Sequence, residues 1–315
     1  MLKSTSLAPQ QLLDALLDAL FEPTRREFFK NVQFAEPIGD PGWFGPDSAV
    51  WYVFSHQPSM ALGFAAAAMM ETLHPTMAWM GYEHSRVIER VNGVPTGQFN
   101  RAAMSSRTGH SMAFFLGVAL GPTRVAEQVC RAVNAMHDTI SGTRPDGQSY
   151  RANDPELLTW NYATMAWGLA AAHTRYHPRP LTGARLEQFF AEYARMGTAI
   201  GAVDVPTTKA GVDDLLRASV PTLGVTLPTV ENLNPLAPWR YPIHQRPVFA
   251  LLFWAVQDLH PDWAQKLMNT PQHTPAGRQV RRALIKAMTT AVGVARIREL
   301  RQANTRTQAV QQILR

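Results

Sequence analysis

The sequence predicts an all-α fold built as a single multi-helix domain, residues 1–315. Apolar residues recur every three or four positions in nearly every segment between prolines and glycines, which is the spacing of one helix face. We find no segment with the alternation of apolar and polar residues that marks a half-buried strand. Hydrophobic residues make up 46% of the chain and charged residues 17%, below the roughly 25% of an average soluble domain. We therefore expect a large core that can enclose an apolar ligand or substrate.

Prolines and glycines divide the chain into short helical segments. The longest stretch without a helical pattern runs from Pro221 to Pro247 and contains six prolines, so we interpret it as a rigid loop that wraps the main body. Beyond it we expect a C-terminal helical extension at about residues 246–315. The expected helices are 9–20, 23–32, 47–55, 58–73, 75–89, 97–119, 122–141, 154–176, 182–199, 207–219, 246–256, 261–269 and 275–303.

The positive net charge of +6 is a property of the C-terminal tail. Residues 277–315 contain nine Lys and Arg side chains and one acid, Glu299, so the rest of the chain is weakly negative. The apolar positions of the tail have helical spacing, which predicts a helical face packed on the body with its charges in water. The alternative is that the basic C-terminal tail touches an acidic surface. No aromatic residue is interleaved with these charges, so we expect no nucleic-acid partner.

The single cysteine, Cys130, excludes an intramolecular disulfide and a cysteine-cluster metal site, and it favours a reducing compartment. Residues 1–20 combine leucines and aspartates in an amphipathic pattern rather than that of a signal peptide. The most apolar stretch, residues 60–80, is interrupted by Glu71, His74 and Pro75, so we predict no transmembrane segment. These features together predict a cytoplasmic protein.

His137 is the residue most suggestive of chemistry. It falls on an apolar stripe in the helix expected at 122–141, so its imidazole should point inward and must be hydrogen-bonded or coordinated. From the pattern alone, a satisfied core histidine is more common than a metal ligand. The stripe consists of Val125, Val129, Ala132, Val133, Met136 and Ile140.

Four blocks of sequence resemble the haem oxygenase family that includes latex clearing proteins (rubber oxygenases) and MpaB-type enzymes. They follow one another at characteristic spacings and cover about residues 36–220. The blocks are Gly39–Ser48 with Val50 and Trp51; Leu73–Pro75 running on to Glu83–Ser85; Arg107 and Thr108 with His137 in 137–142; and Tyr150–Pro155 with Leu157, Leu158 and Trp160, followed by a weaker echo at Val205 and Pro206.

This resemblance implies a globin-like helical core that holds haem b, with His137 as the iron ligand. Arg107 and Thr108 are then expected to face the other side of the iron, where a cation and a hydroxyl stabilise bound dioxygen or peroxide. A second possibility for Arg107 is pairing with a haem propionate or a surface carboxylate. Trp160 is expected to contact the cofactor.

The chain departs from the family pattern at two positions. Members commonly carry an arginine four residues before the threonine, where this chain has Met104. Either Arg101, one turn earlier, substitutes for it, or the pocket on that side of the iron is more apolar. Rubber oxygenases have a lysine where this chain has Arg107, and a guanidinium that stays protonated is a poor iron ligand. We therefore do not expect rubber itself to be the substrate. Glu83 and Glu89 are the candidate carboxylate bases.

The functional prediction is a haem b-dependent oxidoreductase, an oxygenase that acts on a lipophilic or small organic substrate with dioxygen or peroxide. The alternatives are a non-catalytic haem- or lipid-binding protein of the same fold and a helical partner protein without a cofactor. His173 and His177 have the spacing of a helical metal pair, but no glutamate follows the first, and we expect no zinc there. For His110, an ordinary polar contact is preferred over a second iron ligand.

Overall fold

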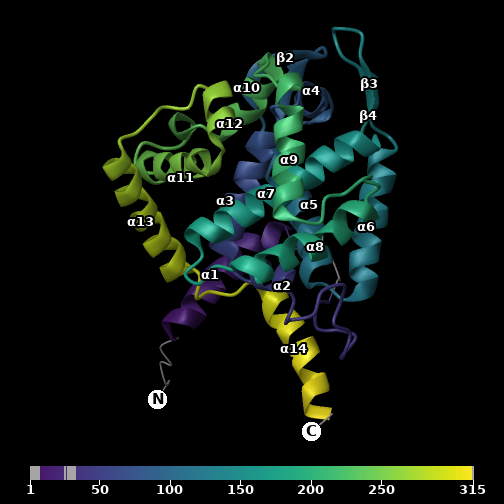
Figure 1. Cartoon of the computed structure of the whole chain (residues 1–315), viewed down its shortest axis with the longest axis vertical. Helices are drawn as coiled ribbons and strands as arrows, with labels where there is room; N and C mark the ends of the chain where they lie inside the picture. The colour runs from purple at the N-terminus through teal and green to yellow at the C-terminus, as the bar shows by residue number, and fades with distance from the viewer. Residues whose placement is uncertain (1–7, 25, 27–32, 314–315) are drawn as a thin grey trace.

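The computed structural model of the protein describes residues 8–24, 26 and 33–313. In this part of the chain there are fourteen α-helices, of which two are central and the others pack around them, and the strands form only two short hairpins (Figure 1). The predicted all-α fold is confirmed. The elements are α1 (Pro9–Thr24), α2 (Ala49–Phe54), α3 (Gln57–Glu71), α4 (Pro75–His84), β1 (Ile88–Val91), β2 (Val94–Phe99), α5 (Arg101–Leu120), α6 (Thr123–His137), β3 (Ser141–Thr143), β4 (Ser149–Arg151), α7 (Pro155–Tyr176), α8 (Gly183–Ala199), α9 (Lys209–Ser219), α10 (Leu227–Leu233), α11 (Arg246–Leu259), α12 (Asp262–Leu267), α13 (Pro275–Val292) and α14 (Arg298–Ile313).

The centre of the molecule is the crossing of α3 and α7. A Cβ at Gly63 would lie 2.9 Å from the carbonyl oxygen of Gly168, and a Cβ at Gly168 would lie 2.5 Å from that of Gly63. The two helices therefore meet backbone to backbone. The helix α7 is buried on all sides, as expected for a helix without a polar face. The helices α2, α8, α9, α11 and α13 pack around it.

Asp40 and Arg306 fasten the first turn of α6 to the rest of the protein. The Asp40 carboxylate accepts hydrogen bonds from N of Thr123 at 2.7 Å, from Oγ1 of Thr123 at 2.8 Å and from N of Gly42 at 2.8 Å. Arg306 is fully buried and donates to three backbone carbonyls, those of Asp40, Phe34 and Leu120. The first residue of α6 is thus tied to Asp40, and Arg306 ties both the backbone of Asp40 and the end of α5 to α14.

The charge of Asp40 is maintained by this arrangement. Burial alone would raise its pKa, but the hydrogen bonds from Gly42 and Thr123 and the positive charge of Arg306 bring it below the ordinary value. Gly42 has a φ of +73°, and a Cβ there would lie 2.3 Å from the carbonyl oxygen of Gly121. Only glycine meets both demands without strain.

The structure corrects the sequence prediction around residues 85–100. The helix expected at 75–89 ends at His84, the one expected at 97–119 begins at Arg101, and a β-hairpin lies between them. Asn92 and Gly93 form its turn with φ values of 52° and 81°. An Asn-Gly pair is the common sequence signal for such a hairpin, and the short strands beside it carried no clear alternation.

Four further predictions need correction or lie beyond what is described. The single helix expected at 275–303 is two helices, because Gly293 packs against the His56 ring and α13 stops there. The stretch 221–247, expected to be a loop, contains α10 and three 3₁₀ turns. The helix expected at 23–32 lies mostly outside the described residues. The helix expected at 122–141 ends at His137, before the hairpin of β3 and β4.

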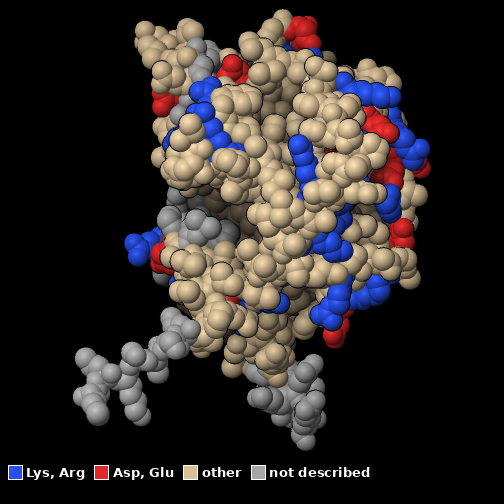
Figure 2. Space-filling view, turned by 90° about the vertical axis from the view of Figure 1, so that its left-hand side faces the viewer, with Lys and Arg blue, Asp and Glu red and all other residues tan. Residues whose placement is uncertain are grey.

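The basic C-terminal segment packs on the body and pairs with acids there. Arg282 binds the buried Asp258 with a contact of 2.6 Å, and Arg301 binds Asp18 of α1. Figure 2 shows Lys and Arg side chains scattered over one face of the molecule with Asp and Glu among them.

In the part of the chain that is described, no helix is both long enough and apolar enough to span a bilayer.

We expect Arg306→Met to lower the free energy of unfolding by about 3 kcal/mol or more, because three buried carbonyls lose their donor. Urea unfolding followed by circular dichroism measures this. The matched control is Arg298→Met on the same helix, whose partly exposed pair with Glu22 spans 3.4 Å and contributes at most about 1 kcal/mol. Equal losses in both variants would contradict a special role for Arg306.

Candidate functional site

The helices α5 and α6 form an antiparallel pair that is buried at one end and open at the other. Every residue from Ala113 to Leu120 is buried, whereas only Gly109 is buried in the preceding part of α5. Within α6, all of which the structure describes, no residue after Cys130 is buried. The open end is therefore formed by the first half of α5 and the second half of α6.

The rise of an ideal helix places Arg107, Thr108 and His137 at about equal distances from the contact between α5 and α6. Near the turn that joins the two helices, a Cβ at Gly117 of α5 would lie within 3.5 Å of methyl groups of both Val125 and Val129 of α6. Gly117 therefore faces the part of α6 that lies between these two valines. Arg107 lies about ten residues from this contact along α5, and His137 lies about ten residues from it along α6. At 1.5 Å per residue, each is about 15 Å from the contact.

The apolar stripe of α6 is buried only where the two helices touch. Val125 is buried, but Ala132 is exposed and Met136 is 49% exposed. The expectation of a continuous buried stripe was therefore wrong for its second half. Val133, between Ala132 and Met136, is half-buried and packs against the core, so the exposed members of the stripe on this part of α6 are Ala132 and Met136.

The His137 imidazole is half-buried at the end of α6, and its Nδ1 atom is buried without a hydrogen-bond partner among the described residues. Burial lowers the pKa of His137, while the side chains of Asn153 and Asp138 oppose this change. Burial therefore favours the neutral form of the imidazole. Neutral imidazole is the form of histidine that binds a metal ion.

Arg107 reaches from α5 toward α3 and α4. A Cβ at Gly81 would lie 3.6 Å from Nη2 of Arg107, an ordinary van der Waals contact, so the guanidinium lies against α4. Burial raises the pKa of Glu71, and the charge of Arg107 and a hydrogen bond from Asn161 lower it in part. Glu71 is a carboxylate near Arg107 that sequence reasoning missed, because nothing in its local pattern distinguishes it from other helix-terminal acids.

The remaining residues predicted for the distal side lie along the same helix. Thr108 is exposed and Met104, one turn before it, is half-buried. Arg101 is the first residue of α5 and donates to the carbonyl oxygen of Arg240 at 2.9 Å. It thus lies two turns from Thr108 and contacts the segment that precedes α11.

Trp160 belongs to the core beneath α3. It is 4% exposed, and its indole Nε1 donates to the carbonyl oxygen of Glu71 at 3.3 Å. Its ring lies 5.9 Å from the ring of His74. The structure thus places Trp160 beside Glu71 and His74.

Of the two candidate bases, Glu83 lies nearer to His137. Its carboxylate accepts hydrogen bonds from Nε1 of Trp79, at 2.9 Å, and from the hydroxyl of Tyr150. A Cβ at Gly142, in the strand that follows His137, would lie 3.2 Å from Oε2 of Glu83. Glu89 lies on the exposed strand β1.

Tyr150 connects this carboxylate to His84. The hydroxyl of Tyr150 is 2.9 Å from Nε2 of His84. Burial and the neighbouring Glu83 raise the pKa of Tyr150, so its hydroxyl keeps its proton. The group is a hydrogen-bonded network within the second and fourth sequence blocks. The only sign of this network in the sequence was that its residues belong to the family-like blocks. The hydrogen bonds themselves join residues far apart in the chain, which no local pattern predicts.

His173 and His177 lie in a compact cluster with His56. The rings of His173 and His177 are 4.4 Å apart, and those of His56 and His177 are 4.6 Å apart. Nε2 of His173 accepts from N of Leu181, and Nδ1 of His177 accepts from N of Arg179. Among the described residues, no group of three or more His, Cys, Asp or Glu side chains is arranged to hold a metal ion.

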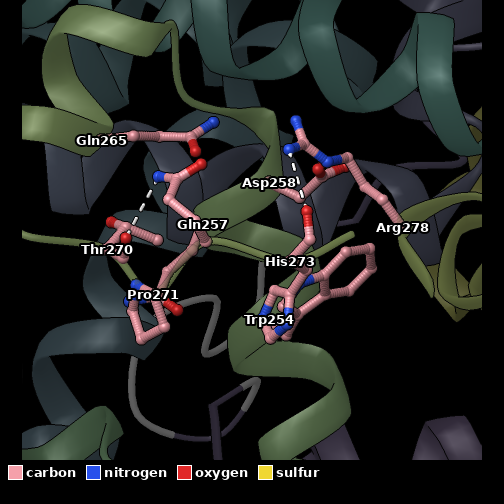
Figure 3. A pocket seen from close by; sticks show the side chains of 9 residues that line it. Trp254, Gln257, Asp258, Gln265, Thr270, Pro271, His273 and Arg278 are labelled. Carbon is pink, nitrogen blue, oxygen red and sulfur yellow. Dashed lines mark hydrogen bonds between the residues drawn. The ribbon is translucent and has the colours of Figure 1, made fainter. Parts of the chain in front are cut away.

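A separate pocket lies between α11, α12 and the start of α13 (Figure 3). Its polar groups bind one another: Nη2 of Arg278 donates to the carbonyl oxygen of His273 at 3.4 Å, and Asp258 binds Arg282. The pocket is far along the chain from the α5–α6 pair and brings together no nucleophile or redox-active set. It is lined by Trp254, Gln257, Asp258, Gln265, Thr270, Pro271, Gln272, His273 and Arg278.

Comparison with known proteins identifies the family. The family model described as "ER-bound oxygenase mpaB/B'/Rubber oxygenase, catalytic domain" matches residues 51–296. The chain therefore belongs to this oxygenase family, as its four sequence blocks predicted. The matched range includes α5, α6 and also α11 to α13. No curated protein and no solved structure matches the chain.

The histidine cluster predicts a loss of stability in mild acid. Burial and the neighbouring imidazoles lower the pKa of His173 to about 3 and that of His177 to about 4. In the unfolded chain both histidines have the ordinary pKa of 6.5, so below pH 6.5 they take up protons when the protein is unfolded but not when it is folded. The free energy of unfolding should fall from pH 7 to pH 5, by up to about 1.4 kcal/mol per pH unit for each histidine.

Urea unfolding at several pH values measures this slope. We expect His173→Gln, which keeps an acceptor for N of Leu181, to make the slope shallower. His244→Gln is the control, because His244 is exposed. A slope unchanged by His173→Gln would show that this histidine does not couple protonation to folding.

Proposed function

We propose that the protein is a haem b-dependent oxygenase whose iron is held by His137. The observation that carries the proposal is the buried Nδ1 atom of His137, which has no hydrogen-bond partner among the described residues and lies at the open end of the α5–α6 pair that also carries Arg107 and Thr108. Membership of the oxygenase family supports the reaction class. Haem supplies the iron chemistry with dioxygen or peroxide, and the protein supplies the ligand and its surroundings.

The residues at the open end fit such a group. Haem iron needs one axial imidazole from the protein, and a lone histidine suffices where a zinc site needs three or four ligands. The uncovered apolar positions of α6 would contact the porphyrin face. Arg107 and Arg101 provide positive charge at the same end, which suits the two propionates of the cofactor or a developing negative charge on oxygen.

The roles of the distal residues follow from their chemistry. Thr108 would donate its hydroxyl proton to a hydrogen bond with the bound oxidant, and Arg107 would stabilise negative charge there. Glu83 and Glu71 are the carboxylates available to take a proton from the substrate. Met104 removes a cation that relatives carry and leaves an apolar surface, which favours a lipophilic or small organic substrate.

The cellular setting is part of the same proposal. The single cysteine is buried and agrees with a cytoplasmic, reducing location. Arg278, Arg281 and Lys286 of α13, for which no ion pair is seen among the described residues, would allow this helix to contact an acidic surface of a membrane or of another protein.

The direct test is the ultraviolet–visible spectrum of the protein produced with a haem supply, compared with its His137→Ala variant. We expect a Soret band in the wild-type protein and its loss or a large shift in the variant, because the iron loses its axial ligand. His110→Ala is the control, since His110 lies on α5 near the same end. A band unaffected by His137→Ala but lost in His110→Ala would move the ligand to α5.

A further inference from the structure

Asn153 lies against the end of α6, immediately before the first turn of α7. Its Nδ2 group donates one hydrogen bond to the carbonyl oxygen of Asn134, at 3.2 Å, and another to a carboxylate oxygen of Asp138. Both acceptors are oxygens, so the amide must present its NH₂ group to them. The orientation of the Asn153 side chain is therefore determined by its own contacts.

This orientation leaves the amide oxygen without a partner. Oδ1 of Asn153 is buried and makes no hydrogen bond among the described residues, and the same holds for Nδ1 of His137. A buried polar atom without a partner costs about 1–3 kcal/mol. The two atoms are complementary, since the amide oxygen only accepts and a ring nitrogen can donate. Asn153 contacts Asn134 and Asp138, which lie three residues before and one residue after His137, so the amide lies beside the last turn of α6 that carries the imidazole.

We propose that Asn153 is the positioning residue of the His137 ligand: its amide oxygen accepts the Nδ1 proton of His137 and leaves Nε2 free to bind iron. The inference rests on the proposed function, because it assigns the iron to His137. A neutral imidazole carries one N–H group and one lone pair. An acceptor at Nδ1 places the proton there and the lone pair on Nε2.

The choice of an amide also sets the electronic character of the ligand. A carboxylate at this place would draw the Nδ1 proton more strongly and make the imidazole a stronger electron donor, whereas an amide orients the ring with less effect on its basicity. Asp138 is already bound to the NH₂ group of Asn153.

The proposal is tested first in the protein without haem. Nitrogen NMR of the histidine rings, with the His137 signals identified by their loss in His137→Ala, reports which ring nitrogen carries the proton. We expect the Nδ1–H tautomer in the wild-type protein and a shift toward the Nε2–H tautomer in Asn153→Leu. Circular dichroism confirms that each variant is folded. A wild-type Nε2–H tautomer, or a tautomer unchanged in Asn153→Leu, would overturn the proposal.

The second measurement uses the haem-loaded protein. We expect Asn153→Asp to raise the ferrous iron–histidine stretching frequency in resonance Raman spectra and to lower the midpoint potential, because the ligand donates more strongly. Asn304→Asp is the matched control, a half-buried asparagine on α14. Equal spectra and potentials for wild type and Asn153→Asp would overturn the proposal.

These two measurements separate the inference from the proposed function. The NMR experiment alone decides the tautomer, and the Soret comparison with His137→Ala alone decides whether His137 binds iron. A failure of one is therefore not mistaken for a failure of the other.

Discussion

The helix α6 is held at both ends, and the geometry of the candidate site depends on this. At its start, the Asp40 carboxylate binds Thr123 and is itself tied to α14 through the buried Arg306. At its end, Asn153 binds the carbonyl oxygen of Asn134. A helix fixed at two points has no freedom to slide or turn about its axis, so the direction of a side chain on its last turn is set by the fold.

This constraint gives the sequence blocks of the family a physical role. The block around Asp40 fastens the start of α6, and the block from Tyr150 to Pro155 fastens its end. The block that ends at Glu83–Ser85 meets Tyr150 through hydrogen bonds. Residues that are far apart in the chain thus act on one helix. The blocks therefore hold in place the helix that carries His137, whether or not their own side chains take part in the reaction.

The helical class and most helix positions followed from the sequence, because the 3.6-residue pattern and the proline and glycine boundaries are local. The hairpin at Asn92 was missed although its turn carries a clear signal, since its strands are short and lack alternation. The sequence blocks singled out His137 as the proposed iron ligand, but they did not point to Asn153. The approach of Asn153 to His137, and of Glu71 to Arg107, joins segments that only tertiary packing brings together, and no local pattern predicts it.

The most direct test of the account is a crystal structure of the haem-loaded protein. The account predicts iron bound to Nε2 of His137 at the open end of the α5–α6 pair, with the amide of Asn153 on the other ring nitrogen and Thr108 facing the opposite side of the porphyrin. Iron bound to His110 or His84, or a haem seated away from α6, would contradict it.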